Sequence, residues 1–214
     1  MYLLDVNVLV AFAYTVHSLH SRAAHWIRRI QSTSPTARPF VTCSIVELGF
    51  IRVASAKKGL AQNLASARAD LGRIRATLKL EVLGDSLHGD QLPGWVTRSD
   101  QTTDGHLIQL ANHHDARLAS LDAGIPDAEL IPYERDFPSE VRDAAYPRYT
   151  DMMTKTRTDA SNSNIAGPNA MPGEFIDDPR WTIDPETGYP CVRARPGARK
   201  ITTEDVKEIL RDFP

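Results

Sequence analysis

The sequence predicts an α/β protein with a parallel sheet flanked by helices. The chain opens on an apolar, partly β-branched run, residues 1–10, which is typical of a buried central strand. Beyond it, short apolar runs alternate with segments whose apolar residues recur at helical spacing. Strands that alternate with helices in this way favour parallel pairing. Ligands of parallel sheets bind just outside the carboxyl ends of the strands, so polar residues at those ends are candidates for function.

The predicted elements follow one another along the first 133 residues. Each helix is inferred from an apolar stripe at helical spacing, and each strand from a short apolar run bounded by polar or turn residues. In chain order the expected elements are a strand at 1–10, a helix at 18–30, a strand at 40–43, helices at 45–55 and 60–79, a strand at 80–83, a helix that begins at Thr102 or Thr103, a strand at 116–121 and an edge strand at 129–132.

Four acidic residues occupy equivalent places in this progression. Asp5 and Asp122 end predicted strands, and Glu47 and Asp104 lie in the first turns of predicted helices. These ends should meet at one edge of the sheet, where like charges repel unless a cation neutralises them. Carboxylate oxygens select hard cations, Mg²⁺ or Mn²⁺, and two such ions can activate a water for displacement at a phosphodiester. The sequence shows no competing Ser-His-Asp or Cys-His arrangement and no glycine-rich phosphate loop.

Two of these acids also have a structural interpretation. Asp5 could be the N-cap of a helix that begins near Asn7. Glu47 could complete a capping box with Ser44, three residues before it. The sequence leaves both interpretations open beside the functional one.

In order along the chain, these stretches resemble the motifs of PIN-domain ribonucleases, and within them the VapC-type toxins of bacterial toxin–antitoxin pairs. The resemblance rests on residues 4–9, on the helix that carries Glu47, and on residues 103–107 and 118–122. It spans residues 1 to about 133. It implies a Rossmann-like sheet, a Mg²⁺- or Mn²⁺-dependent endoribonuclease, dimerisation, and neutralisation by a bound antitoxin.

The resemblance also assigns roles to individual positions. The residues that it makes catalytic are Asp5, Glu47, Asp104 and Asp122. The three aspartates would hold the metal, and Glu47 would assist as a further ligand or as the base that orients water. Asn7 would be a supporting polar residue. Gly105 departs from the pattern, since the family often has a residue with a side chain after the third acid.

Composition narrows the class further. Hydrophobic content of 42%, charged content of 24% and a net charge of −2 are ordinary for a soluble globular protein. Cys43 and Cys191 lie far apart and give neither metal-ligand spacing nor a disulfide framework, so a cytoplasmic location is expected. No secretory signal or membrane-spanning stretch is recognisable. Histidines at 17, 20 and 25 are expected at the surface or in caps.

After the predicted domain the character of the chain changes. Residues 134–170 are rich in Thr, Ser, Asn, Gly and Pro and are expected to form a partly disordered linker. Residues 171–214 recover order, with extended pieces around the turn at 184–190 and a short helix capped by Thr202 or Thr203. This segment is too short to form its own core. Its apolar residues should therefore be covered by the preceding domain, in cis or in a neighbouring chain; they are Phe175, Trp181, Ile183, Val192 and Leu210.

The last segment resembles the toxin-binding part of an antitoxin, especially at residues 184–190 and 201–206. A basic side chain that entered the acidic quartet would replace the charge of the metal and block substrate. The candidates for this inhibitory role are Arg193, Arg195 and Arg199. The chain would then be a toxin fused to its antitoxin. The alternative is a family-specific tail that only completes the surface.

The sequence thus indicates a metal-dependent endoribonuclease toxin, with RNA as substrate, held inhibited by its own C-terminal segment. Two other functions stay open. One is a non-catalytic binding module whose acidic pocket receives a basic partner. The other is a nuclease that acts on DNA.

Overall fold

The computed structural model describes residues 1–33, 38–56, 60–133 and 178–211. It confirms the predicted α/β class: five parallel strands form one sheet in the order β3-β2-β1-β4-β5. The strands of this sheet are β1 (Tyr2–Leu4), β2 (Phe40–Cys43), β3 (Glu81–Leu83), β4 (Arg117–Ser120) and β5 (Glu129–Leu130). The helices of the same part are α1 (Val6–Ala13), α2 (His20–Thr33), α3 (Ser44–Ser55), α4 (Leu64–Leu78), the 3-10 turn η1 (Ser99–Gln101) and α5 (Thr102–His113).

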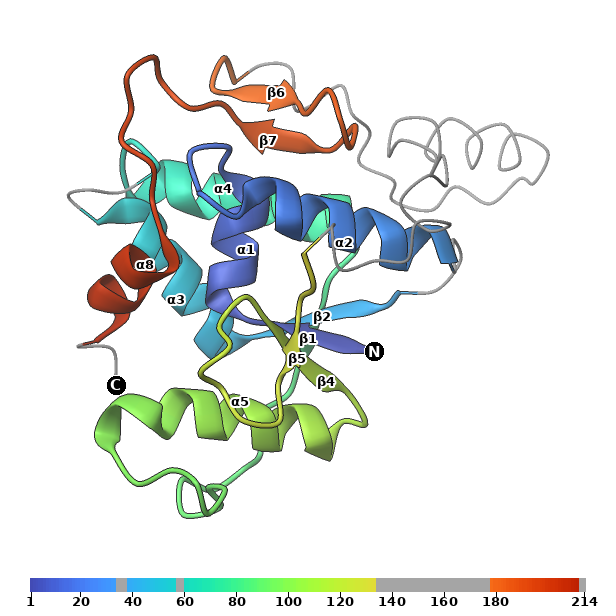
Figure 1. Cartoon of the computed structure of the whole chain (residues 1–214), viewed down its shortest axis with the longest axis vertical. Helices are drawn as coiled ribbons and strands as arrows, with labels where there is room; N and C mark the ends of the chain where they lie inside the picture. The colour runs from blue at the N-terminus through green and yellow to red at the C-terminus, as the bar shows by residue number, and fades with distance from the viewer. Residues whose placement is uncertain (34–37, 57–59, 134–177, 212–214) are drawn as a thin grey trace.

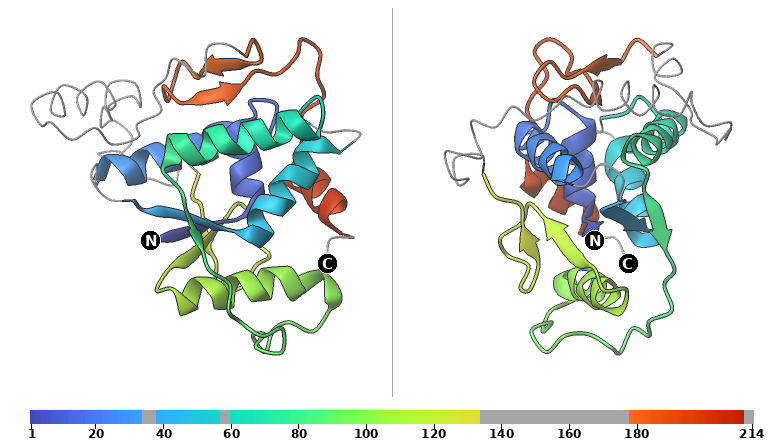
Figure 2. Two further views of the ribbon diagram at one scale, coloured as in Figure 1. Left: turned by 180° about the vertical axis from the view of Figure 1, so that it is seen from behind. Right: turned by 90° about the vertical axis from the view of Figure 1, so that its right-hand side faces the viewer.

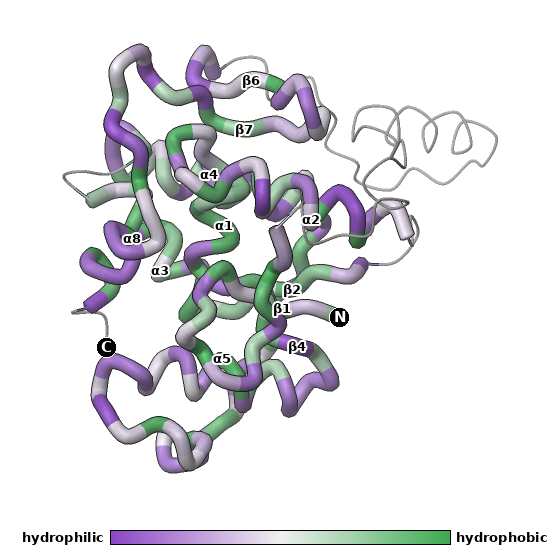
Figure 3. The backbone as a smooth tube through the Cα atoms, in the orientation of Figure 1, coloured by the Kyte–Doolittle hydropathy of each residue, from purple (hydrophilic) through white to green (hydrophobic). Residues whose placement is uncertain are grey.

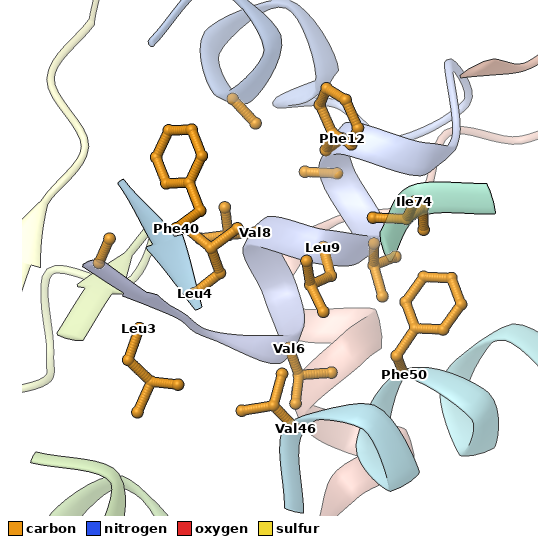
Figure 4. Packing of buried hydrophobic residues seen from close by; sticks show 14 of the residues in the cluster. Leu3, Leu4, Val6, Val8, Leu9, Phe12, Phe40, Val46, Phe50 and Ile74 are labelled. Carbon is orange, nitrogen blue, oxygen red and sulfur yellow. The ribbon is translucent and has the colours of Figure 1, made fainter. Parts of the chain in front are cut away.

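The helices form two layers on the sheet (Figures 1 and 2). α1, α2, α3 and α4 pack together on one face, and α5 packs on the other face against β1 and β4. α1 lies at the centre of the larger layer, where its apolar side chains meet those of β1, β2, α3 and α4 (Figure 4). The carboxyl ends of the parallel strands consequently open toward α3 and α5, whose first turns carry acidic residues.

The predicted opening strand is too long. β1 ends at Leu4, and the chain turns directly into α1 at Val6. Every residue of α1 is buried, so the helix has no polar face and its sequence carries no helical period. A short apolar run of this kind cannot be told from a strand by periodicity. β1 is nevertheless the central strand, as predicted.

One predicted helix cap is wrong. Ser44 is the first residue of α3, and the cap position belongs to Cys43, which makes no side-chain cap hydrogen bond. The helix predicted to begin at Thr102 or Thr103 begins at Thr102, where η1 runs into it without a break. The cap of the last helix was predicted correctly, since Thr202 caps it and forms a capping box with Asp205.

The C-terminal segment lies on the domain in two places (Figures 1 and 2). Its described elements are the antiparallel hairpin strands β6 (Trp181–Ile183) and β7 (Pro190–Val192) and the helix α8 (Thr203–Leu210). The hairpin sits over the helical layer, on the side away from the sheet, and α8 packs against α3. The predicted linker, 134–170, and Phe175 lie outside the described residues.

Backbone hydrogen bonds join this segment to the loop after α1. The N–H of Thr15 donates to the carbonyl of Val192 at 3.0 Å, and the N–H groups of Ser18 and Ile201 donate to Ile201 and Val16 at 2.8 and 3.1 Å. Figure 3 shows that hydrophobic residues concentrate in α1 and the sheet, whereas α8 is mostly hydrophilic.

The domain covers part of the apolar surface of the segment, as predicted. Tyr189, Val192 and Val206 are buried against it, but Ile183 is 48% exposed, contrary to expectation. His17 and His20, near the start of α2, are not surface residues, since both are buried beneath the segment. Nδ1 of His17 accepts the backbone N–H of Leu19, directly before α2, at 3.1 Å. In the described ranges no helix is both long and apolar enough to cross a membrane.

Candidate active site

Asp5 stands at the carboxyl end of the central strand, between β1 and α1. Its backbone is extended, as at an N-cap, but its side chain makes no cap hydrogen bond. The carboxylate instead accepts a hydrogen bond of 2.8 Å from the Ser120 hydroxyl on the neighbouring strand. Burial raises the pKa of Asp5, and the Ser120 hydrogen bond only partly opposes this. Asp5 therefore occupies the N-cap position of α1, as one interpretation expected, while its carboxylate is held at the sheet edge and caps no N–H of the helix.

Ser120 ties Asp5 to Asp122. While its hydroxyl donates to Asp5, the same oxygen accepts the backbone N–H of Asp122 at 3.0 Å. Asp122 in turn accepts the N–H of Gly124 at 2.9 Å, which orients its carboxylate. The sequence analysis missed Ser120. The available signal was a hydroxyl at the last, buried position of a strand beside the central one.

Asp104 lies in the first turn of α5 and completes a group of three aspartates. Burial is the largest cause that raises its pKa, and the charges of Asp5 and Asp122 add to it, so that the pKa of Asp104 is about 7. The departure at Gly105 has a steric reason: a Cβ there would collide with the side chain of Val96. α5 can thus approach the 92–96 loop closely only because position 105 has no side chain.

Glu47 occupies a different environment at the same edge. Its Oε1 atom lies 3.5 Å from Nε of Arg75 on α4, and in the described structure this buried oxygen accepts no hydrogen bond. Burial raises the pKa of Glu47, and the charge of Arg75 partly opposes this effect. Unlike the pKa of Asp104, that of Glu47 is not shifted by a neighbouring carboxylate. The structure therefore brings the three aspartates together and places Glu47 beside Arg75, apart from them.

A basic residue that was not predicted from the sequence contacts one of the aspartates. Nζ of Lys207, on α8, pairs with Oδ2 of Asp122. Its charge lowers the pKa values of both Asp5 and Asp104 against the effects that raise them. One turn earlier on α8, the Thr203 hydroxyl accepts a 3.0 Å hydrogen bond from the side-chain amide of Asn7.

These contacts lie along one side of α8. Thr203, Lys207 and Leu210 are spaced so that they share a helix face, and Leu210 packs over Gly49 of α3. This spacing was a signal available in the sequence, and it places the tail helix across the carboxyl edge of the sheet.

The three arginines proposed from the sequence are placed elsewhere. Arg193 donates to the Thr182 hydroxyl at 2.9 Å, within the hairpin. Arg199 pairs with Asp205 at 2.9 Å, within the tail. No contact in the part of the chain that the structure describes links Arg195 to an acidic residue of the site.

The three aspartates suit a hard divalent cation in their chemistry. All three offer carboxylate oxygens, and their charges oppose one another, which a cation would relieve. Asp122 pairs with the Lys207 ammonium, whose charge also acts on Asp5 and Asp104. In the described residues, no group of three or more His, Cys, Asp or Glu side chains is positioned to hold a metal ion.

Replacing Asp104 with asparagine should stabilise the protein in metal-free buffer at pH 8. An unfolded Asp104 ionises near 3.8 and the folded one near 7, so folding is increasingly penalised as the pH rises from about 4 to 7, and the penalty persists above 7. We expect a gain of about 1–2 kcal/mol after allowance for solvent screening. Urea unfolding at pH 8 and pH 4 measures it, with Asp90→Asn, at an exposed loop residue, as control. An equal effect at both pH values would contradict the assignment.

A parallel sheet in this order, with three coupled aspartates at its carboxyl edge, defines an α/β domain of the PIN type. The chain belongs to the family of VapC ribonucleases. It is 38% identical over 129 residues to Ribonuclease VapC38 of Mycobacterium tuberculosis, a match that covers 58% of this chain and 87% of the relative. Ribonuclease VapC29 of the same species is 35% identical over 137 residues, covering 61% and 96%.

Ribonuclease VapC39 of this species is 29% identical over 135 residues, covering 59% of this chain and 91% of the relative. Each match thus takes in nearly the whole relative and about three fifths of this chain. No family model matches the chain.

Proposed function

We propose that this protein is a metal-dependent endoribonuclease toxin whose own C-terminal segment holds it inhibited. The observation that carries the proposal is the Lys207 ammonium on Asp122, the aspartate that Ser120 couples to Asp5. The names of the relatives support ribonuclease activity, since each is called a ribonuclease. RNA is therefore the proposed substrate, and an antitoxin-like segment is the proposed partner.

In this proposal Asp5, Asp104 and Asp122 hold Mg²⁺ or Mn²⁺. The bound ion supplies a lowered water pKa and positive charge at the phosphodiester. Ser120 fixes the orientation of Asp5 and of the backbone at Asp122, so two ligands are prearranged. Glu47 orients water or takes its proton, because burial keeps the pKa of its carboxyl above the ordinary value.

The inhibitory side chain in this proposal is Lys207, in place of the three arginines first considered. An ammonium beside Asp122 provides the positive charge that the aspartates would otherwise obtain from a cation. α8 also covers Asn7, the residue expected to support the site, through the hydrogen bond to Thr203. The tail thereby opposes both metal and substrate at one edge.

The proposed division of the chain is a nuclease domain at 1–133, a linker at 134–170 and an inhibitory segment at 171–214. The backbone hydrogen bonds between the segment and the loop after α1, and the Asn7–Thr203 hydrogen bond, support this division. A homodimer and a cytoplasmic location are further parts of the proposal, taken from the family resemblance.

The test is cleavage of a mixed RNA pool with Mg²⁺, Mn²⁺ or EDTA, comparing the full chain with one that ends at Thr150. Cleavage by the shorter chain alone, abolished by EDTA, is the expected result. Equal cleavage by both chains would keep the nuclease and remove the inhibition. Silence from both, in folded protein, would favour the non-catalytic binding module, and cleavage of DNA in preference to RNA would favour the DNA nuclease.

The docked tail should also make the stability of the protein sensitive to pH. Burial and the neighbouring His20 lower the pKa of His17 to about 4, although Asp205 and Glu204 oppose the shift. Unfolding returns His17 to about 6.5, so the unfolded state binds the extra proton as the pH falls from about 6.5 to 4, and the contribution of His17 to stability falls over this range.

At pH 5 this loss amounts to about 2 kcal/mol relative to pH 7.5. Asp104 acts in the opposite direction over the same range, so the His17 contribution is measured as the difference between the full chain and His17→Gln in urea unfolding at the two pH values. His17→Gln should gain about 2 kcal/mol relative to the full chain on going from pH 7.5 to pH 5, and His88→Gln, at an exposed loop residue, should show no such difference. A slope that His17→Gln does not alter would assign the pH dependence to other groups.

A further inference from the structure

We infer that the buried carboxylate of Asp70 is a recognition site for the adjacent pair Arg180–Trp181 of the tail, and that this site determines which inhibitory segment the domain retains. The inference rests on the proposed inhibition and adds its partner recognition. It concerns the far side of the helical layer, away from the carboxyl edge where Lys207 lies (Figures 1 and 2).

Asp70 is a fully buried acid in the middle of α4. Its Oδ1 accepts hydrogen bonds from Nη2 of Arg180 at 2.9 Å and from the indole N–H of Trp181 at 3.1 Å. Its Oδ2 accepts from Nη1 of Arg180 at 3.1 Å and from the Tyr14 hydroxyl at 2.9 Å. Three of these four hydrogen bonds come from the tail, and the domain supplies the fourth.

The remaining domain contact is weaker. Arg73, one turn along α4, has its Nη1 atom 3.6 Å from Asp70, which is an ion pair too long for a hydrogen bond. A buried carboxylate that loses its partners bears a large desolvation cost. The domain therefore contains a carboxylate whose burial is compensated mainly by two consecutive tail residues.

The geometry selects the chemistry of those two residues. Arg180 meets Asp70 with two parallel N–H donors, an arrangement that the planar guanidinium supplies and a lysine ammonium does not. Trp181 adds an indole donor beside it, and the guanidinium of Arg73 lies 5.4 Å from the centre of its ring.

Asp178 completes the recognised segment. Its carboxylate accepts from Nη2 of Arg180 at 2.6 Å and from Nη1 of Arg73 at 3.1 Å. Acid and base thus alternate between domain and tail: Asp70 with Arg180, and Arg73 with Asp178. The partner that fits is an Asp-x-Arg-Trp turn, closed by the N–H of Trp181 on the carbonyl of Asp178 at 3.0 Å, which this chain carries at residues 178–181.

The recognition site and the inhibitory helix act on different parts of the domain. Tyr14 directly follows α1 and Asp70 lies in α4, beneath the hairpin, whereas α8 packs on α3. Loss of the Lys207 contact therefore removes no hydrogen bond from Asp70. We expect that α8 can leave the carboxyl edge while the hairpin stays attached, so the segment is retained and can return.

The two cysteines allow a direct test in the full chain. Cys191 is buried in β7 of the hairpin, and Cys43 is buried in β2 of the central sheet. Labelling by a maleimide, quantified at each cysteine by peptide mass spectrometry, reports hairpin release at Cys191 and general unfolding at Cys43. This readout needs no nuclease activity, so its failure is distinguishable from failure of the proposed function.

Arg180→Lys should raise the labelling rate of Cys191 about tenfold or more and leave that of Cys43 unchanged. The matched control is Arg193→Lys, which alters an arginine of the same hairpin that bonds only within it. Lys207→Gln should leave Cys191 protected. Asp70→Asn combined with Arg180→Gln should be no worse than either change alone, because both remove the same interaction.

Three results would overturn the inference. The first is a rate of Cys191 labelling in the Arg180→Lys protein that is no higher than the rate in the Arg193→Lys control. The second is exposure of Cys191 by Lys207→Gln. The third is protection of Cys191 that disappears on dilution, which would show that the tail of a second copy, and not the chain's own, occupies Asp70.

Discussion

Replacing Asp5 with asparagine is expected to reduce metal-dependent RNA cleavage by about a thousandfold or more. Metal coordination in such a site contributes several kcal/mol to the transition state, and each 1.4 kcal/mol is about a factor of ten in rate. Asp5 stands at the end of the central strand, and its carboxylate is held by Ser120 and coupled to Asp104 and Asp122. The asparagine side chain keeps the shape of aspartate and one of its oxygens, but it lacks the negative charge that would bind the metal ion.

The measurement requires a background in which cleavage is visible, either the chain that ends at Thr150 or a full chain with Lys207 replaced. The matched control is Asp127→Asn, at an exposed position with φ of 63°, a backbone conformation that asparagine tolerates. Circular dichroism and urea unfolding establish that the variant is folded. Cleavage that survives in folded Asp5→Asn protein would remove Asp5, and with it the aspartate group, from the mechanism.

The aspartates could be predicted from the sequence because topology alone brings them together. Asp5 and Asp122 follow adjacent parallel strands, and Asp104 begins the helix that precedes the second of them. Any chain with this order of elements places these positions at one edge of its sheet. The same topology puts Glu47 in the first turn of α3, but it gives no information on the pairing of Glu47 with Arg75, which depends on how α4 packs against α3.

The basic contact could not be predicted in the same way. Arg193, Arg195 and Arg199 were chosen because they lie between apolar anchors, but they belong to the connection between β7 and α8, where Arg193 and Arg199 pair with residues of the tail itself. The residue that reaches Asp122 is Lys207, in the helix that follows the three arginines, and its position depends on how α8 packs on α3. Thr203 and Leu210 share its face, so a helical projection of the last residues would have been more informative than their charge.

Asp70 shows a further limit of reading charges along a helix. In the sequence it lies among arginines on α4, a pattern that indicates a solvated face. Its burial depends on Arg180, 110 positions further along the chain, and no local pattern reveals a partner at that distance.

The second large effect is expected from reversing the charge of Lys207. Lys207→Glu should increase RNA cleavage by the full chain at least tenfold in the presence of Mn²⁺, because a carboxylate there repels Asp122 and the two aspartates beside it. Lys207→Gln, which removes the charge without reversing it, should give a smaller increase. Initial rates on the same RNA pool across a Mn²⁺ titration measure both effects.

The size of this effect does not follow from the strength of the ion pair. The Lys207 side chain is 55% exposed, and a pair so accessible to water contributes about 1 kcal/mol or less to docking. Val206 and the hydrogen bonds at Asp70 hold the segment instead. Lys207 matters because of where its charge lies, at the carboxylates that a cation must reach.

Lys200→Glu provides the matched control, since it makes the same change of charge at an exposed position of the same tail, outside α8. It should leave cleavage at the level of the unaltered full chain. If Lys207→Glu also leaves cleavage unchanged, while the chain that ends at Thr150 is active, then inhibition comes from coverage of the site by the tail and not from the ammonium. If both lysine variants activate equally, the effect is general repulsion of an acidic tail by an acidic edge. Only activation specific to position 207 assigns inhibition to the contact with Asp122.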